Sequence, residues 1–203
     1  MGPARQAIDA STAAAADLSA AQARVVDAAL DLFAKHGVGG TSLQMIARAL
    51  GVTKAAVYHQ FRTKDEIVLA AAEGELTRLQ EVLDRAEAET TRAQARHVLV
   101  SGIVDLAVDR RRTSSVILND PVIRQFFADH DRFRRVMGRM TSLLGGGSGL
   151  TGGTRASDGR VATAVFVAAV SGAVMHPLVA GLDDDTMRAQ LRLMAHKLLD
   201  VEG

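Results

Sequence analysis

The side chains best suited to chemistry in this sequence lie close together between residues 41 and 64. Lys54 can donate hydrogen bonds to guanine O6 or N7, while Ala55 and Ala56 are small enough for apolar contact with a thymine methyl group. Tyr58 and His59 follow one helical turn later, within reach of a phosphate or a base edge. These residue types at this spacing indicate contact with the base edges and backbone of duplex DNA.

Further polar residues of the same segment suit the sugar-phosphate backbone. Thr41, Ser42 and Lys64 are expected at helix N-termini, where amides and side chains bind phosphates. Gln44 can pair with adenine or a phosphate. Thr41 and Thr53 would also cap helices without any DNA. The predicted DNA-contacting residues are Thr41, Ser42, Gln44, Thr53, Lys54, Ala55, Ala56, Tyr58, His59 and Lys64.

Local signals for helix ends place these residues on a helix-turn-helix. Capping boxes at residues 19–22, 41–44 and 63–66 mark helix starts, because a Ser or Thr oxygen and a Glu or Gln side chain satisfy each other's backbone amides. Gly51 ends one helix and Thr53 caps the next. Such a unit holds one helix across the phosphate backbone and inserts the next into the major groove.

Neighbouring residues are expected to seat and bound these helices. Val57 and Phe61 lie four residues apart, on one face of the short helix after Thr53, and should anchor it. Gly37 is expected to end the first helix, with Gly39-Gly40 as a loop. The helix that opens at residues 63–66 should run to about residue 89.

Charge is distributed unevenly along the 203 residues, although the net charge is only +1. Residues 20–64 carry six basic and two acidic side chains, a net charge of +4, whereas residues 65–203 carry 17 basic and 19 acidic side chains, a net charge of −2. This pattern is typical of a small nucleic-acid-binding head on a near-neutral body. The chain contains no cysteine, which excludes disulfides, thiolate metal sites and cysteine catalysis.

The rest of the sequence predicts helices and no strand, so the expected fold class is all-α, with a three-helix head on a larger helical bundle. The apolar stretch at residues 161–180 contains Ser171, His176 and Pro177, and we interpret it as a core helix rather than a membrane span. The expected domains are a flexible arm (1–18), a DNA-binding domain (19–66) and a ligand-binding and dimerisation domain (67–203). The expected helices of the last domain are 92–110, 120–144, 159–181 and 184–201, with a short one near 113–118 and a glycine-rich loop at 145–153.

Apolar residues of the body are candidates for an effector pocket, because Met and Phe together fill irregular cavities. Core packing also accounts for most of them, and His176 is either a core histidine or a pocket residue. The low aromatic content, 3%, favours a largely apolar or acyl-like small molecule. The candidate pocket residues are Leu99, Ile103, Leu106, Phe126, Phe127, Phe133, Met137, Met140, Phe166, Val170 and His176.

The last two expected helices have features of a subunit interface. The first contains small residues that allow close helix approach, and the second has apolar residues at alternating spacings of four and three, as in a coiled-coil seam. We favour a homodimer over an intramolecular contact, because the apolar face of a helix pair that lies outside a complete core must be buried against another subunit. The predicted interface residues are Ala162, Ala169, Gly172, Ala173, Met187, Leu191, Met194 and Leu198.

Other polar groups of the body are weaker candidates for chemistry. His97 shares a helix face with Asp105 or Asp109, but no nucleophile or oxyanion site accompanies them. The Asp-His-Asp run at residues 129–131 would point its side chains in different directions on a helix, which argues against a metal site. We predict no catalytic residues, no metal and no cofactor. The alternatives are a helical enzyme and a helix-turn-helix module that binds protein.

The N-terminal motifs resemble the DNA-binding domain of TetR-family transcriptional regulators over about residues 20–68. Gln60 departs from the family pattern, in which an aromatic–His pair is often followed by Phe. The matching positions are Ala29-Leu30-Asp31-Leu32-Phe33, Gly37, Thr41-Ser42, Ile46-Ala47, Gly51-Val52-Thr53, and Tyr58-His59-Gln60-Phe61 with Lys64.

The resemblance implies an all-helical homodimer in which three N-terminal helices read DNA and later helices hold a small-molecule pocket and the dimer interface. It also implies that ligand binding swings the two heads apart through the long helix that starts at Lys64. We therefore predict a ligand-responsive transcriptional regulator, a repressor rather than an activator, that binds a pseudo-palindromic double-stranded operator as a homodimer. Its expected location is the cytoplasm, at the nucleoid, with no membrane association.

Overall fold

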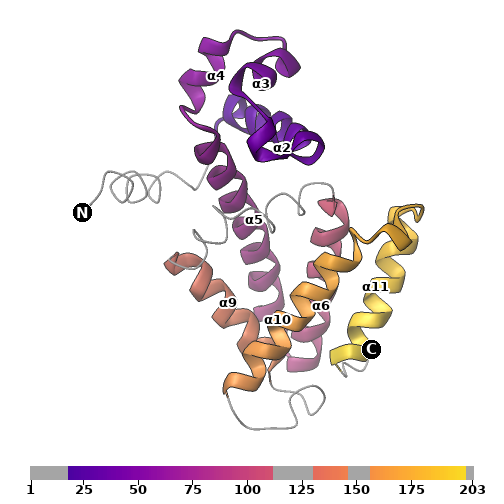
Figure 1. Ribbon diagram of the computed structural model, residues 1–203. Helices are drawn as coiled ribbons and strands as arrows, with labels where there is room; N and C mark the ends of the chain where they lie inside the picture. Colours follow the sequence, from indigo (N-terminus) through magenta and orange to yellow (C-terminus); the bar gives the residue numbers. More distant parts are fainter. Residues whose placement is uncertain (1–17, 112–129, 146–155, 200–203) are drawn as a thin grey trace. The chain divides into compact units, whose positions relative to one another are not determined.

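The computed structural model describes residues 18–111, 130–145 and 156–199, and all regular elements in these ranges are helices (Figure 1). The all-α prediction is confirmed. The predicted arm up to residue 17 and the short helix near 113–118 lie outside the described residues, as does nearly all of the glycine-rich loop. The helices are α2 (Ala20–Gly40), α3 (Leu43–Leu50), α4 (Lys54–Gln60), α5 (Lys64–Glu87), α6 (Arg92–Asp109), α9 (Asp131–Leu144), α10 (Ala156–Ala173), the 3₁₀-helix η1 (Pro177–Val179) and α11 (Asp184–Leu199).

The chain divides into two compact units, and we call the described part of the first the head and that of the second the body. The division falls inside α5, whereas the sequence predicted it after residue 66. The first turns of α5 bury Ile67, Val68 and Ala71 within the first unit, so the core of the head extends past the start of that helix. Among the described residues, the first unit holds 18–75 and the second holds 76–111, 130–145 and 156–199.

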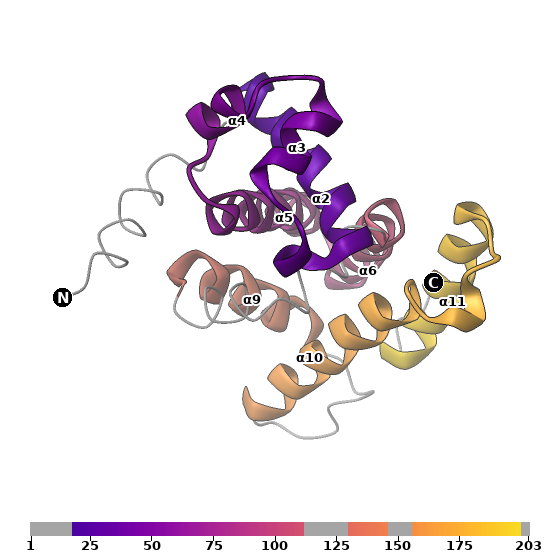
Figure 2. The same ribbon diagram turned by 45° about the horizontal axis from the view of Figure 1, so that its top comes forward.

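Local sequence signals start and end the helices of the head (Figure 2). Ser19 and Gln22 form the predicted capping box, with contacts of 3.0 and 3.2 Å between side chains and backbone amides. Gly51 ends α3 with a φ of 68°, a conformation that glycine adopts without strain. Thr53 caps α4 because its Oγ1 accepts a hydrogen bond from the Ala56 amide at 3.2 Å. These ends leave a short, well-defined turn between α3 and α4.

The start of α3 differs from the prediction by one residue. Ser42, not Thr41, is the cap, because its Oγ accepts from the Met45 amide at 3.2 Å. Thr41 is buried, and its hydroxyl donates to the Gly37 carbonyl at 2.9 Å. Gly37 breaks α2, as expected, with φ 71° and ψ 162°, but the chain then makes one more short turn instead of a Gly-Gly loop.

The start of α5 carries half of the predicted capping box. The Thr63 hydroxyl accepts from the Glu66 amide at 3.1 Å, as expected. The Glu66 carboxylate reaches one residue further back than predicted and accepts from the Arg62 amide at 2.7 Å. The helix therefore starts where the sequence indicated, with a different partner for its acidic residue.

The body is built around one buried apolar cluster to which α5, α6, α9, α10 and α11 contribute. Helices α5 and α6 approach closely at Gly102, where a Cβ atom would lie 2.5 Å from Cγ1 of Val82. Glycine is therefore required at that crossing for steric reasons. The largest fully buried side chains of the cluster are Phe166, Leu83, Leu99, Met140 and Met187.

The helix predicted at residues 120–144 does not run continuously through its middle. His130 has non-helical angles, φ −90° and ψ 115°, and caps α9 through Nδ1, which accepts from the Phe133 amide at 3.4 Å. Histidine is an unusual cap, so the usual Ser, Thr, Asp and Asn signals did not indicate this start. The predicted start near residue 120 lies outside the described residues.

The helix predicted at residues 159–181 ends at Ala173. Pro177 has no amide to donate to the Ala173 carbonyl, and it disfavours helical geometry in His176. His176 is exposed and caps η1, with Nδ1 accepting from the Leu178 amide at 3.3 Å. Every helix within the described ranges is too short or too polar to traverse a lipid bilayer.

A histidine pair joins α6 to α11 within the body. The rings of His97 and His196 stack with centroids 4.8 Å apart and planes 20° from parallel. Burial lowers the pKa of His196, and the charges of His97 and Arg192 act in the same direction. These surroundings therefore favour the neutral form of the His196 imidazole.

We expect this pair to make the body less stable in mild acid. A histidine whose pKa is lower in the folded than in the unfolded state stabilises the fold above the unfolded value of about 6.5, and this contribution is lost as the pH falls below it. Urea unfolding at pH 7.5 and 5.5 should give a smaller free energy of unfolding at pH 5.5, with a smaller difference in His196→Gln. The exposed His36 gives the control His36→Gln, which should keep the wild-type difference. Equal pH differences in all three proteins would contradict this expectation.

Candidate nucleic-acid interface

Helix α4 presents a face of small and polar residues, seated by two apolar anchors. Val57 is fully buried and Phe61 is nearly so, as their four-residue spacing predicted. The Tyr58 side chain, by contrast, is 47% exposed. Because α4 is short, its two anchors suffice to fix which side faces outward. The exposed residues of this helix and its cap are Thr53, Lys54, Ala55, Ala56, Tyr58 and His59, all of them predicted to contact DNA.

Helix α3 supports α4 and adds a second set of exposed polar groups. It packs against both α2 and α4 and buries Ile46 and Ala47 completely. Ser42 and Gln44, two of the predicted DNA contacts, are exposed at its N-terminal end. A pair of helices joined and packed in this way can place one across a DNA backbone and the other in the major groove.

Two residues predicted to bind phosphates are engaged inside the head. Thr41 is only 2% exposed, so its hydroxyl, on the Gly37 carbonyl, does not belong to the DNA-facing surface. The Lys64 ammonium donates to the carbonyl oxygen of Val38 at 2.7 Å and to that of Gly39 at 3.4 Å. The Lys64 contacts join the start of α5 to the end of α2, a pairing that local sequence signals do not reveal.

Two basic residues that the sequence analysis did not select lie on exposed positions of the head. The Arg62 guanidinium carbon is 5.5 Å from the centre of the Tyr58 ring, a cation–π arrangement that orients the ring and adds positive charge beside it. Arg48 is exposed in the last turn of α3. The four-residue separation of Tyr58 and Arg62 was a signal that could have identified the pair.

The predicted pocket residues fall into different environments of the body. Phe126 and Phe127 lie outside the described residues, and His176 is exposed, so it is not a core histidine. Leu106, Phe133 and Met137 are partly buried at the margin of the apolar cluster. The members buried in its core are Leu99, Ile103, Met140, Phe166 and Val170.

The predicted interface residues include both buried and exposed side chains. Ala162 and Met187 are buried within their own chain, so they do not belong to an outward surface. Ala169 and Gly172 on α10 and Met194 on α11 are exposed, and three more are partly buried, namely Ala173, Leu191 and Leu198. The outward face also includes residues that the prediction omitted, Val161, Val165 and Leu193.

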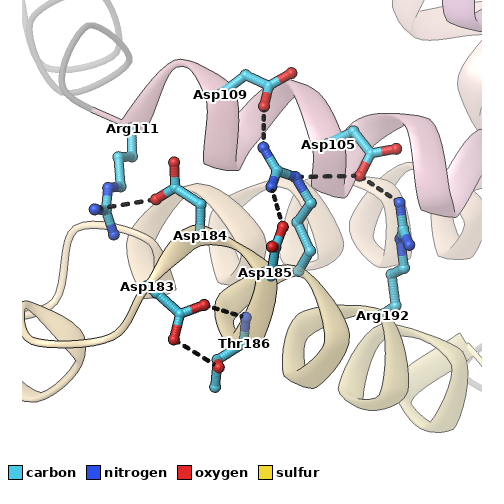
Figure 3. A network of polar contacts seen from close by, with 9 residues as sticks. Asp105, Asp109, Arg111, Asp183, Asp184, Asp185, Thr186 and Arg192 are labelled. Atoms are coloured by element: carbon cyan, nitrogen blue, oxygen red, sulfur yellow. Dashed lines mark hydrogen bonds and ion pairs between the residues drawn. The ribbon is translucent and has the colours of Figure 1, made fainter.

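The carboxylates considered for an enzymatic role lie in ion pairs between α6 and α11 (Figure 3). Arg192 donates to Asp105 at 2.5 Å, and Arg188 approaches Asp105 and pairs with Asp109. A further pair joins Arg111 to the Asp184 carboxylate at 3.0 Å. These carboxylates therefore hold two helices together.

The histidines of the body do not complete an acid–base or metal site with them. His97 stacks on His196 instead of donating to Asp105 or Asp109. In the described part of the chain, no three His, Asp or Glu side chains are grouped as metal ligands would be. The predicted triplet at 129–131 is only partly described, and within it His130 caps a helix.

Comparison with known proteins identifies relatives of the head. A family model described as "Bacterial regulatory proteins, tetR family" matches residues 25–71. The HTH-type transcriptional regulator SrpR of Pseudomonas putida is 43% identical over 56 residues, which are 28% of this chain and 26% of SrpR. The HTH-type transcriptional repressor AcnR of Corynebacterium diphtheriae is 25% identical over 117 residues, 57% of this chain and 60% of AcnR. The chain thus spans less than two thirds of the length of these relatives.

The fold extends beyond the head. The crystal structure of AibR in complex with isovaleryl coenzyme A and operator DNA superposes with a TM-score of 0.68 at 19% identity. The superposition covers 90% of this chain and 100% of AibR. At this level of identity the similarity establishes a shared fold.

Proposed function

Because the chain belongs to the TetR family of bacterial regulatory proteins, we propose that it is a ligand-responsive transcriptional repressor that binds a pseudo-palindromic operator as a homodimer. The observation that carries this proposal is the exposed face of α4, with Lys54, Tyr58 and His59 held outward by buried Val57 and Phe61. In a dimer the two copies of α4, the helix that would read the base edges, would enter successive major grooves about 34–36 Å apart. The proposed place of action is the cytoplasm, on the DNA of the nucleoid.

The two alternative functions account for fewer of the observations. Members of this family are regulators and not enzymes, and the ion-paired Asp105 and Asp109 are not arranged as catalytic acids or bases. A helix-turn-helix that binds protein would not need an outward lysine beside two alanines on α4. Binding to duplex DNA that weakens steeply with added salt distinguishes the proposed function from this second alternative.

An outward apolar surface on α10 and α11 supports the homodimer. The two helices contact each other, and Val161 and Val165 on α10 are 62% and 46% exposed. Leu193 and Met194 on α11 are 47% and 51% exposed. Exposed apolar side chains on two helices that contact each other favour burial against a second copy. Exposed small residues on α10, namely Ala164, Ala168, Ala169 and Gly172, would allow that copy to approach closely.

The proposed effector is a largely apolar or acyl-like molecule bound in the body. Leu106, Phe133 and Met137 are the pocket candidates with the best access, because they lie at the margin of the apolar cluster and are only partly buried. AibR, which shares the fold, was crystallised with an acyl thioester, isovaleryl coenzyme A. Coupling to the head would run along α5, which begins in the first unit and ends in the second.

The experiment that tests the function is selection of binding sites from random DNA duplexes by the purified protein. A palindromic consensus with half-sites about one helical turn apart is expected. Recovery of unselected sequences, or no retention of DNA at low salt, would argue for the protein-binding alternative. The selected duplex also serves as the operator in the predictions that follow.

We expect Lys54→Ala to weaken binding to the selected operator and to relax its base preference at one position of each half-site. A lost base contact costs on the order of 1–3 kcal/mol, which corresponds to roughly 5- to 150-fold in affinity. Fluorescence anisotropy with the operator and with duplexes substituted at each position measures both effects. Lys35→Ala removes the same charge from an exposed position of α2 and should leave the base preference unchanged. If Lys54→Ala keeps the affinity and the base preference of the wild type, Lys54 does not contact a base.

A further inference from the structure

The cation at the start of α5 is held by backbone carbonyls at the end of α2. The Lys64 ammonium donates to the Val38 carbonyl at 2.7 Å and to the Gly39 carbonyl at 3.4 Å. One residue earlier, the Gly37 carbonyl accepts from the Thr41 hydroxyl at 2.9 Å. We call this set, the carbonyls of residues 37–39 with the Thr41 hydroxyl and the Lys64 ammonium, the carbonyl clamp.

Gly37 gives the backbone the shape that the carbonyl clamp needs. Its φ of 71° and ψ of 162° lie in a region that is accessible essentially to glycine alone. A Cβ atom at this position would meet nothing within 4 Å, so the requirement is conformational and not one of space. The break in α2 at Gly37 allows the Thr41 amide to donate a hydrogen bond to the Val38 carbonyl at 3.3 Å. It also allows the Thr41 hydroxyl to donate to the Gly37 carbonyl.

Electrostatics favours the Lys64 ammonium at the end of α2 over a position beside the start of its own helix. A cation at the N-terminus of its own helix is opposed by the helix dipole, whereas the same cation at the C-terminal end of another helix is favoured. Lys64 is the first residue of α5, and its ammonium lies at the end of α2. The Val38 contact is partly buried, which strengthens it.

We propose that Lys64 is a positioning residue, which fixes the start of α5 to the junction of α2 and α3 and makes no contact with DNA phosphate. This inference rests on the proposed DNA-binding function. The carbonyl clamp ends at Thr41, directly before Ser42 caps α3, and α3 packs against the reading helix α4. A movement of the start of α5 would therefore shift the carbonyl clamp and α3, and with them the position of α4.

The test compares the salt dependence of operator binding in three variants, between 50 and 200 mM salt. Each phosphate contact contributes about 0.9 to the slope of log affinity against log salt, so losing one contact per subunit changes the slope of a dimer by about 1.8. We expect Lys64→Met to bind the selected operator about one order of magnitude more weakly, the size of one lost base contact, with an unchanged slope. Lys64→Gln, which keeps one donor for Val38, should recover part of the affinity. Lys54→Met, the same change at a predicted base contact, should relax the base preference, which Lys64→Met should leave unchanged.

Two results would overturn the inference. A smaller slope in both Lys64 variants would show that Lys64 neutralises a phosphate, and an unchanged affinity in folded Lys64→Met would show that it does not position the reading helix. Thr41→Val gives a second variant, because a buried hydroxyl cannot reach DNA. It should weaken operator binding with an unchanged slope, and its effect on the urea midpoint should not add to that of Lys64→Met. Absence of DNA binding by the wild type would reject the proposed function instead, and the unfolding experiment would still report on the carbonyl clamp.

Discussion

Replacing Val165 with arginine is expected to convert the proposed dimer into folded monomers and to weaken operator binding by about 10²- to 10⁴-fold. Val165 is 46% exposed on α10, so a longer side chain can extend into solvent in a monomer. In a dimer formed through the outward face of α10 and α11, the same arginine would bury an unpaired charge near its symmetry-related copy. A monomer has one reading helix, and loss of the linked second site removes an advantage of about 10²–10⁴ in affinity.

Light scattering coupled to size exclusion measures the oligomeric state, and fluorescence anisotropy with the selected operator measures affinity. The matched control is Gly138→Arg, which adds the same charge at an exposed position of α9 where a Cβ meets nothing within 4 Å. We expect this control to remain dimeric and to bind the operator like the wild type. A dimeric Val165→Arg, or a wild type that is monomeric at micromolar concentration, would reject the interface on α10 and α11.

Replacing the adjacent Phe166 with alanine is expected to lower the free energy of unfolding of the body by about 3–5 kcal/mol. Phe166 is fully buried in the apolar cluster, whereas the neighbouring Val165 is 46% exposed. The substitution removes a large apolar side chain and leaves a cavity that the surrounding helices fill only partly. Since small proteins are stable by only about 5–15 kcal/mol, this loss is a large fraction of the total.

Urea unfolding followed by circular dichroism measures the effect, and exchange of body amides separates it from unfolding of the head. Leu178→Ala is the control, because Leu178 is 88% exposed and its removal should change stability by about 0.5 kcal/mol or less. If Phe166→Ala and Leu178→Ala shift the unfolding midpoint equally, the packing described for α10 is incorrect. The two neighbouring positions thus separate assembly from folding, since Val165 affects the former and Phe166 the latter.

Helix starts and ends in the head were predictable because they depend on interactions only three or four residues long. The Ser19–Gln22 capping box, the left-handed Gly51 and the Thr53 cap all use residues of the same turn. The anchors Val57 and Phe61 follow from helical periodicity alone. Where two adjacent residues could both cap, as with Thr41 and Ser42, the local signals did not distinguish them, because burial of Thr41 decides the choice.

Predictions for the body were less accurate because the apolar residues there have more than one possible partner. Met187 and Met194 both belong to the predicted seam of α11, yet the first is 2% exposed in its own chain and the second is 51% exposed. A spacing of four and three identifies an apolar stripe but not the surface that covers it. The same ambiguity placed exposed His176 in the core, although Pro177 directly after it was a signal for the end of the helix.

The helical class, the position of the helix-turn-helix and the outward face of its second helix could be predicted from the sequence, because each depends on caps, glycines and periodicity within a few residues. Which of these polar residues are available to a partner depends on contacts between distant parts of the chain. The tertiary structure placed Thr41 inside the head and the Lys64 ammonium on the carbonyls of Val38 and Gly39, whereas it left Lys54 and Tyr58 exposed. The physical reason is that a lysine binds whichever negative or dipolar group lies nearest, and for Lys64 that group comes from a helix 26 residues earlier in the chain.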